Sequence, residues 1–347
     1  MLSPCRGSTR RSPTSRLSRA GVVCSAFAAV TAIAGVAGAQ TSSSEIVAGN
    51  TPAPFAFNYG ETETTRGVAM GGALRAAGNG TTAPYMNPAG MAMTRVYHIE
   101  AQAQVTPEYG RQVYGGTIVD SVTSRLAGGL GVQGGFLDPD GIDRSFIDVR
   151  IALAYALSDA FSIGLGGRYM KVVEDGLGPL GDSKASGGLT DPDGGRFALA
   201  NVPTFDAGFA VRLGEIVRLG IAGQNLSYPN DGIMPTTFGG GVAVATEDFT
   251  IEADGLADFT SYEEIAPRAM LGGELLLADS VPIRGGYRFD GGAASHAVSA
   301  GVGYLGREFS IEGAVRRTLV GPDATTIVFS IAYFLESSGL ARAGDEF

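Results

Sequence analysis

Apolar and polar residues alternate with a period of two along most of the chain after residue 94. In the segment 97–106, Tyr97, Ile99, Ala101, Ala103 and Val105 share one face, and His98, Glu100, Gln102 and Gln104 share the other. The same alternation runs through 147–157 and 161–169, which are separated by the tight turn Ser158–Ala160. A period of two bounded by turn residues predicts β-strands joined as hairpins.

The alternation recurs often enough to predict fourteen strands. Besides the three segments above, eleven more are centred near Thr117, Leu130, Phe209, Leu219, Val242, Ala253, Leu275, Gly285, Ala300, Ile311 and Phe329. Residues 94–335 therefore provide about 17 residues for each strand and its connection, and a membrane-crossing strand needs about 9–11.

Aromatic residues occur at many of the predicted strand ends, where the girdles of a membrane barrel would lie. They are Tyr97, Tyr109, Phe136, Phe161, Phe205, Phe249, Phe259, Phe289, Phe309 and Phe334. A water-soluble β-sandwich would also alternate, so the pattern alone leaves both classes open. We favour an all-β fold, a transmembrane antiparallel β-barrel of about 14 strands over 94–335, followed by a short tail at 336–347.

The first 39 residues have the pattern of an export signal. Five arginines with no acidic residue precede an uncharged stretch, Ala20–Ala39, which ends in the small residues Ala37-Gly38-Ala39. This arrangement predicts a signal peptide at 1–39, although a membrane anchor would also be about 20 apolar residues long. Both cysteines, Cys5 and Cys24, precede the predicted cut, so the exported chain would have no disulfide.

Composition excludes several functional classes. The net charge of −10 becomes −15 after removal of the five arginines, since 20 basic and 35 acidic residues remain. An acidic chain of this kind lacks the basic face of a nucleic-acid binder. Together with the export signal, the predicted barrel places the protein in the outer membrane of a Gram-negative bacterium, where its partners would be outer-membrane lipid and lipopolysaccharide.

The predicted connections differ in length. Short turns such as 157–161 alternate with longer segments, of which Glu174–Arg196 is the longest and is expected to be a mobile outer surface loop. The Asp-Pro-Asp-Gly sequences at 138–141 and 191–194 are similar to calcium loops, but they lack the further spaced ligands and are interpreted as turns.

A more specific motif lies before the first strand. Residues 66–92 read RGVAMGGALRAAGNGTTAPYMNPAGMA, a Gly-rich, helix-like segment leading into Asn87-Pro88-Ala89-Gly90. This segment resembles the N-terminal signature of the FadL-like superfamily of outer-membrane barrels, which includes fatty-acid transporters and PorV/PorQ-type barrels. The sequence 219–226, LGIAGQNL, is also similar to a strand of these families.

The resemblance implies a fourteen-stranded barrel whose N-terminal segment, 40–93, folds into the lumen as a plug or hatch. On this basis the hatch and gating residues are Gly71, Gly72, Asn87, Pro88, Ala89 and Gly90. The residues alone favour only a bend, because Pro88 fixes its own backbone and forces Asn87 out of the helical region. A tight turn entering the first strand therefore stays open as an alternative.

Polar residues that alternate against the apolar faces are expected to line the lumen and to satisfy one another around the plug. The candidates are His98, Glu100, Gln102, Gln104, Asp148, Arg150, Arg168, Asp206 and Arg212. Catalysis is not expected, because the chain has two histidines and the serine beside His296 points to the opposite face of any strand. No metal site or cofactor is predicted.

Two functions follow from the sequence. The first is an outer-membrane channel for uptake or export of hydrophobic, fatty-acid-like small molecules, with passage controlled by the hatch. The second is a non-transporting PorV-type barrel that acts as a scaffold or shuttle together with secretion-machinery proteins. An apolar pocket in the lumen would favour the channel, and a polar, fully plugged lumen would favour the scaffold.

Overall fold

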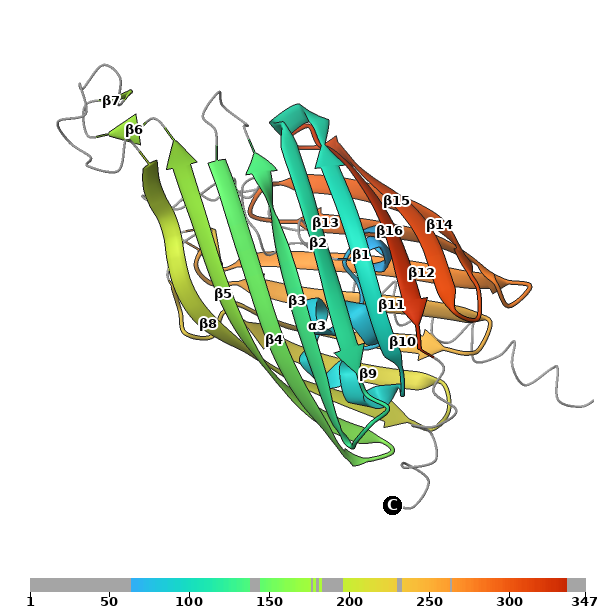
Figure 1. Ribbon diagram of the computed structural model, residues 1–347. Helices are drawn as coiled ribbons and strands as arrows, with labels where there is room; N and C mark the ends of the chain where they lie inside the picture. The colour runs from blue at the N-terminus through green and yellow to red at the C-terminus, as the bar shows by residue number, and fades with distance from the viewer. Residues whose placement is uncertain are drawn as a thin grey trace, which may run out of the picture. The chain divides into compact units, whose positions relative to one another are not determined.

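Fourteen antiparallel strands form a closed barrel in the computed structural model, which describes residues 64–137, 144–175, 177–178, 181–182, 196–229, 233–262 and 264–335 (Figure 1). Each strand pairs with its neighbour in the chain, and β1 closes the barrel by pairing with β16. The strands are β1 (Tyr97–Thr106), β2 (Arg111–Asp120), β3 (Leu126–Leu137), β4 (Arg144–Ser158), β5 (Phe161–Asp175), β8 (Arg196–Leu213), β9 (Val217–Gln224), β10 (Thr237–Ala245), β11 (Phe249–Asp258), β12 (Ala266–Leu277), β13 (Val281–Asp290), β14 (Ser295–Leu305), β15 (Phe309–Val320) and β16 (Thr325–Phe334).

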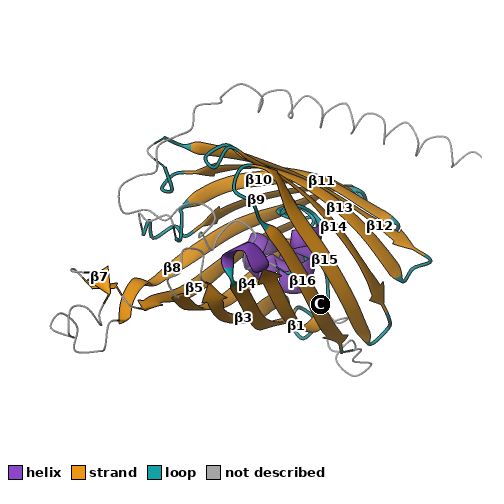
Figure 2. Cartoon of the chain, turned by 90° about the horizontal axis from the view of Figure 1, so that it is seen from above, coloured by secondary structure: helices purple, strands orange, loops and turns teal. Residues whose placement is uncertain are grey.

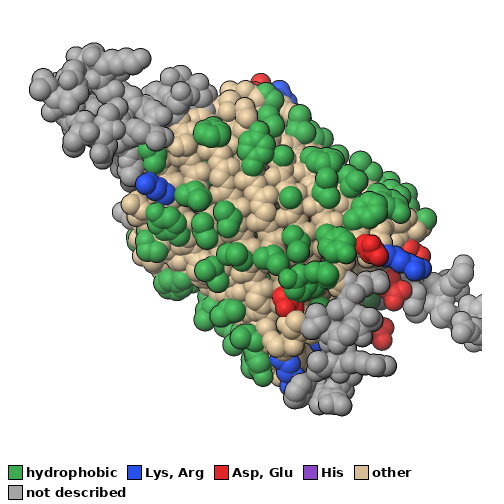
Figure 3. Space-filling view, viewed as in Figure 1, with side chains coloured by type: hydrophobic (Ala, Val, Ile, Leu, Met, Phe, Trp, Pro, Cys, Tyr) green, Lys and Arg blue, Asp and Glu red, His purple; other side chains and the backbone are tan. Residues whose placement is uncertain are grey.

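Every strand predicted from the alternation is present in this barrel. The outer surface is apolar, as Ile151 and Leu165 illustrate with exposed fractions of 58% and 66%, whereas Asp148 on the inner face is 1% exposed. Figure 3 shows hydrophobic side chains spread over one face of the barrel, with few charged groups among them. A surface of this kind would be unfavourable in water but is suited to the hydrocarbon of a bilayer. The predicted fold class, a membrane β-barrel of fourteen strands, is therefore confirmed.

The two ends of the barrel differ in their connections. We call the end that carries the connections 121–125, 159–160, 214–216, 246–248, 278–280 and 306–308 the turn end, and the opposite end the loop end. The chain enters β1 and leaves β16 at the turn end. Two short strands of a separate sheet, β6 (Leu177–Gly178) and β7 (Gly181–Asp182), follow β5 at the loop end.

Several predictions concern residues that the structure does not describe. The signal peptide at 1–39, the first part of the plug at 40–63 and the tail at 336–347 lie outside the described residues, as do both Asp-Pro-Asp-Gly sequences and most of Glu174–Arg196. These remain predictions.

Residues 64–93 lie inside the ring of strands, as Figure 2 shows. The elements are α2 (Thr65–Ala69), η3 (Gly80–Thr82), α3 (Ala83–Met86) and η4 (Pro88–Met93). The expectation of one helix-like segment at 66–92 was too simple, because Gly71 and Gly72 have φ angles of +67° and +86° and end the first helix after one turn. We call residues 64–93 the plug. In the described part of the chain, no helix is long and apolar enough to cross a bilayer.

Candidate functional site

Two carboxylates on β11 hold a turn of the plug. Asp254 accepts the backbone N–H groups of Leu74 and Arg75, each at 3.1 Å, and the Arg75 guanidinium at 3.2 Å. Glu252, two residues earlier on the same inner face, accepts the N–H groups of Ala76 and Ala77 at 2.6 and 2.9 Å. Four consecutive backbone donors that converge on two buried carboxylates form an anion-binding turn, so this contact fixes residues 74–77 to the wall.

An arginine of the plug makes a second attachment at the turn end. Arg66 donates from Nε and Nη2 to the two carboxylate oxygens of Glu274 on β12, at 3.0 and 2.9 Å. Arg284 on β13 joins Glu274 to Glu312 on β15, with both distances at 2.5 Å. Because the Arg66–Glu274 pair is bidentate and is part of a row of alternating charges, it fixes both the position and the orientation of the Arg66 side chain.

Asn87, a predicted hatch residue, is fully buried and connects three parts of the molecule. Its side-chain Nδ2 donates to the carbonyl of Arg75 at 2.8 Å and to the carbonyl of Phe209 on β8 at 2.9 Å. Its Oδ1 accepts the N–H of Ala89 at 3.1 Å, and the backbone of Asn87 is extended, with φ −155° and ψ 104°. One side chain therefore caps the bend, closes the plug on itself and attaches it to the wall.

The remaining hatch candidates are packing positions. The carbonyl of Ala89 accepts a hydrogen bond from Ser162 on β5 at 2.8 Å, and Pro88 begins η4, where its missing N–H removes no helical bond. A Cβ at Gly90 would overlap the carbonyl of Gly78 within the plug, and a Cβ at Gly71 would lie 2.9 Å from the backbone of Tyr287. These residues are small because the plug backbone packs against itself and the wall. Gly72 serves the turn after α2 through its positive φ.

Glycines on the inner wall match the plug backbone. A Cβ added at any of them would overlap a plug atom, so that something would have to shift. They come from five different strands and are Gly164, Gly208, Gly220, Gly272 and Gly286. Glycine in a strand permits such close backbone approach. Contact with the plug therefore explains the absence of a side chain at these five positions.

Tyr85 of the plug lies at a layer of charge in the middle of the barrel. Its hydroxyl is 2.8 Å from the Thr117 hydroxyl, and the guanidinium of Arg150 lies over its ring at 4.9 Å from the centroid. Burial raises the pKa of Tyr85 to about 12. The phenol therefore stays neutral and keeps its hydrogen bond at any physiological pH.

Four of the predicted lumen residues form one network on β4, β5 and β8. Asp148 accepts from Arg168 at 2.9 and 3.1 Å and from Arg150 at 3.3 Å, and Arg150 lies 3.9 Å from Asp206. Two arginines thus balance two aspartates in a buried layer. Charges removed from water in this way are tolerated only when they pair. Arg168 also donates to Asn225 at 3.1 Å.

The polar residues of β1 lie along the inner wall, with Glu100, Gln102 and Gln104 buried and His98 partly buried. The hydroxyl of Thr81 in the plug donates to Glu100. Arg212, on β8 near the turn end, donates to the carbonyl of Met93 at 2.7 Å, where the plug leads into β1. The structure therefore places every predicted lumen residue beside the plug or along the inner wall.

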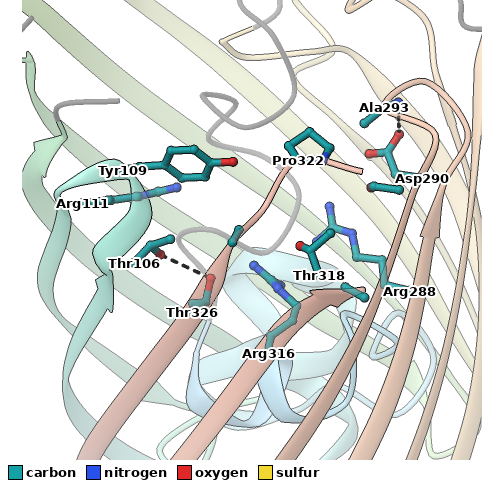
Figure 4. Close-up of a pocket in the computed structure, with 13 residues that line it drawn as sticks. Thr106, Tyr109, Arg111, Arg288, Asp290, Ala293, Arg316, Thr318, Pro322 and Thr326 are labelled. Carbon is teal, nitrogen blue, oxygen red and sulfur yellow. Dashed lines mark hydrogen bonds between the residues drawn. The ribbon is translucent and has the colours of Figure 1, made fainter. Parts of the chain in front are cut away.

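Two cavities lie on opposite sides of the plug. The first opens at the loop end, and in Figure 4 Arg111, Arg288 and Arg316 point into it from β2, β13 and β15. The second lies at the turn end between the plug and the wall and is lined by polar residues that include Arg66, His98 and Glu312. The plug separates the two cavities.

An apolar cluster lies inside the barrel at the loop end, next to the first cavity. It lies on the loop-end halves of β2–β5 and β8 and includes two residues of the β9–β10 connection. Its members are Val113, Leu137, Phe146, Met170, Val172, Ala200, Ile233 and Met234, with Val202 packed against them. The guanidinium of Arg111 lies 5.8 Å from the centre of the Phe146 ring, so the cluster borders the loop-end cavity. A buried apolar cluster contrasts with the charged layer beside it.

Reasoning from sequence missed several residues of this site. Arg75, Gln224 and Asn225 were not singled out, and the alternation gives no reason to choose Glu252 and Asp254 from among the other inward-facing polar residues. The LGIAGQNL resemblance at 219–226 was the available signal for Gln224 and Asn225. In the part of the chain that the structure describes, no group of three or more His, Cys, Asp and Glu side chains is placed to hold a metal ion.

Comparison with known proteins gives matches at the level of structure only. No family model and no curated protein sequence matches the chain. The toluene transporter TbuX of Ralstonia pickettii superimposes with a TM-score of 0.57 at 14% identity, over 80% of this chain and 99% of that one. The monoaromatic hydrocarbon channel CymD gives 0.56 at 14% identity, over 78% and 96%.

A FadL homologue of Pseudomonas aeruginosa gives a TM-score of 0.55 at 15% identity, over 79% of this chain and 98% of that one. Of these three structures, TbuX is described as a transporter and CymD as a channel. At identities of 14–15% these superpositions show the fold alone, and this shared fold confirms the resemblance to FadL-like barrels that residues 66–92 carry. The chain therefore has the FadL-like fold of outer-membrane barrels, closed by fourteen strands around its own N-terminal segment.

Proposed function

We propose that this protein is an outer-membrane channel for hydrophobic small molecules and that the plug controls passage. The apolar cluster at the loop end carries this proposal, because a barrel that served only as a scaffold would have no need of an apolar wall in its lumen. Support also comes from the toluene and hydrocarbon channels that share the fold. Fatty acids and smaller hydrocarbons both fit an apolar wall of this kind.

The attachment of the plug fits a gating role. Its polar contacts to the wall are hydrogen bonds and ion pairs from single side chains, including those of Asn87, Glu252, Asp254 and Glu274. Small apolar clusters that join plug and wall residues add packing to these contacts. Individual polar contacts of this kind contribute modestly to stability when broken and remade with water. Release of the plug therefore would not require the barrel strands to separate, since each strand keeps both of its neighbours.

The orientation of the barrel in the membrane follows from the difference in connection length between its two ends. We place the loop end outside the cell and the turn end in the periplasm, as is usual for barrels in which the longer connections face outward. Hydrophobic molecules would then enter at the loop end beside the apolar cluster and leave through the polar cavity on the far side of the plug.

Uptake of toluene by reconstituted liposomes tests the proposal. Full-length protein should admit toluene faster than empty liposomes, and a variant lacking residues 64–80 should admit it faster still and show higher conductance in a planar bilayer. Benzoate, a charged molecule of similar size, is the matched control and should pass poorly through the intact protein. A folded deletion variant with unchanged uptake and unchanged conductance would mean that the plug blocks nothing.

A PorV-type scaffold is the second candidate, and one observation favours it. The plug is attached to the wall on many sides, from Ser299 on β14 to Thr117 on β2, which is the fully plugged lumen expected of a barrel that transports nothing. Secretion-machinery proteins would then be its partners. Absence of toluene uptake together with co-purification of such a protein would support this alternative.

A further inference from the structure

Asn225 is a buried residue in an uncommon backbone conformation at the end of β9. Its φ angle is +53°, in the left-handed region that asparagine tolerates better than most residues, and it is fully buried. Its backbone N–H donates to Asp206 at 2.8 Å, and its Oδ1 accepts from Arg168 at 3.1 Å. A residue held in this conformation by two members of the charged layer has a specific positioning role.

The same residue ties together the two ends of the β9–β10 connection. Its Nδ2 donates to the carbonyl of Pro235 at 2.8 Å, and its own carbonyl accepts the hydroxyl of Thr236 at 2.9 Å. The residues immediately before Pro235 are Ile233 and Met234, which are 5% and 0% exposed within the apolar cluster. Asn225 therefore fixes the point from which these two side chains enter the lumen.

Asn225 is also connected to the plug by two routes. The first runs through its neighbour Gln224, whose Nε2 donates to the carbonyl of Tyr85 at 2.6 Å. The second runs through Arg168 and Asp148 to Arg150, which lies over the Tyr85 ring. Both routes end on the same residue of the plug.

We propose that Asn225 couples the β9–β10 connection to the plug, so that an uncharged hydrophobic molecule that displaces Ile233 and Met234 from the apolar cluster loosens the plug at Tyr85. In the closed form the two side chains occupy the binding position themselves. This inference rests on the proposed channel function and adds to it a binding position, a ligand class and a coupling residue.

The ligand class follows from the lining. The described members of the cluster are aliphatic, aromatic or thioether side chains. Arg111 lies over the Phe146 ring, and Arg168, whose charge is paired with Asp148, donates to the Sδ of Met170 at 3.4 Å. The arginines and aspartates of the adjoining layer bind each other, so an anion placed in the cluster would lose water without gaining one of these paired arginines. A neutral molecule about as large as the two displaced side chains fits the position best.

Cysteine accessibility tests both halves of the proposal. In full-length protein with Cys5 and Cys24 replaced by serine, Met234→Cys reports on the cluster and Ala83→Cys, also fully buried, reports on the plug. Each protein, in lipid nanodiscs, is treated with a charged thiol reagent in the presence of toluene or of benzoate. Toluene, and not benzoate, should raise the modification rate of both cysteines about tenfold, a typical size for coupling between two sites.

The coupling residue is tested with Asn225→Gly, which keeps the left-handed backbone and removes the side chain. Tyr228→Gly is the matched control, because Tyr228 lies in the same connection, also has a positive φ of 56°, and is exposed. In the Asn225→Gly protein, toluene should still expose Met234→Cys but should change the modification of Ala83→Cys less than about twofold. Thr236→Val, which removes only the hydroxyl bonded to Asn225, provides a second variant should the first fail to assemble.

The outcomes separate this inference from the proposed function. An Ala83→Cys that responds to toluene in Asn225→Gly as it does in the parent would overturn the coupling, and so would toluene uptake without exposure of Met234→Cys. Constant exposure of Ala83→Cys in Asn225→Gly, with or without toluene, would support the control of the plug by Asn225. Failure of the parent protein to admit toluene would count against the channel function itself.

Discussion

The side-chain oxygen of Asn87 lies so close to the α-carbon of Gly208 on β8 that a methyl group at residue 208 would overlap it. The Asn87 side chain therefore packs directly on the backbone of the wall, which has no side chain at this point. The same bend carries the hydrogen bond from Asn87 to the carbonyl of Phe209. The plug can hold this position only because residue 208 has no Cβ.

Gly208→Ala should displace the plug while leaving the barrel closed. Overpacking of this size typically costs about 1–3 kcal/mol, and the plug can move more readily than a strand paired on both sides. Conductance in a planar bilayer should rise, and heat-modifiable migration on a gel should stay as in the parent. Gly255→Ala is the matched control, since nothing lies within 4 Å of a Cβ there. Equal conductance in both variants would contradict this account.

Asn87→Ala should loosen the bend and change uptake of a hydrophobic probe without preventing assembly. The substitution leaves the carbonyls of Arg75 and Phe209 without their donor, at a cost of about 1–3 kcal/mol. Pro88→Ala should have a weaker effect in the same direction, because it removes only a backbone restriction. Asn201→Ala, at an exposed position on β8, serves as the control. Probe uptake by liposomes provides the measurement.

Glu252→Gln should weaken the attachment of the turn at residues 74–77. A neutral amide accepts hydrogen bonds less strongly than a carboxylate. An NH₂ group would also replace one of the two carboxylate oxygens, and this group cannot accept the N–H of Ala76 or Ala77 that it would face. We expect faster hydrogen exchange at these two amides and a higher single-channel conductance. Glu247→Gln, in the exposed turn before β11, should change neither, and protection of the amides as in the parent would argue against the role of Glu252.

Tyr85 gives a prediction about alkaline pH. Because burial raises its pKa to about 12 in the folded protein from an ordinary value near 10, its contribution to stability is complete below about pH 10 and is lost as the pH rises toward 12. Between these two values, plug protection measured by Ala83→Cys modification should decline in the parent. Tyr85→Phe cannot ionise and should show a smaller decline. A steeper decline in Tyr85→Phe would rule out this explanation.

Export gives a prediction that does not depend on the plug. Cleavage after Ala39 should leave a chain that begins at Gln40, and mass measurement of the protein extracted from outer membranes would detect it. A mass that retains residues 1–39 would favour the anchor instead.

The barrel could be predicted from sequence because its information is local. In β4, Ile147, Ile151 and Leu153 face outward and Asp148 and Arg150 face inward, and a strand places successive side chains on opposite faces whatever surrounds it. The turn signals between such segments then fixed the number of strands. The motif Asn87-Pro88-Ala89-Gly90 likewise indicated a bend from its own backbone restrictions.

The partners across the lumen were decided only by the tertiary structure. The contact of Glu252 with Ala76 joins residues 176 positions apart, and that of Arg66 with Glu274 joins residues 208 positions apart. Nothing in the alternation says which inward carboxylate meets the plug and which meets another arginine, because every inward polar residue fits the same period. That choice depends on how the closed barrel brings distant strands around one segment. The contacts of Asn225 with Asp206 and Arg168 likewise form only when the strands that carry them are brought together in the barrel.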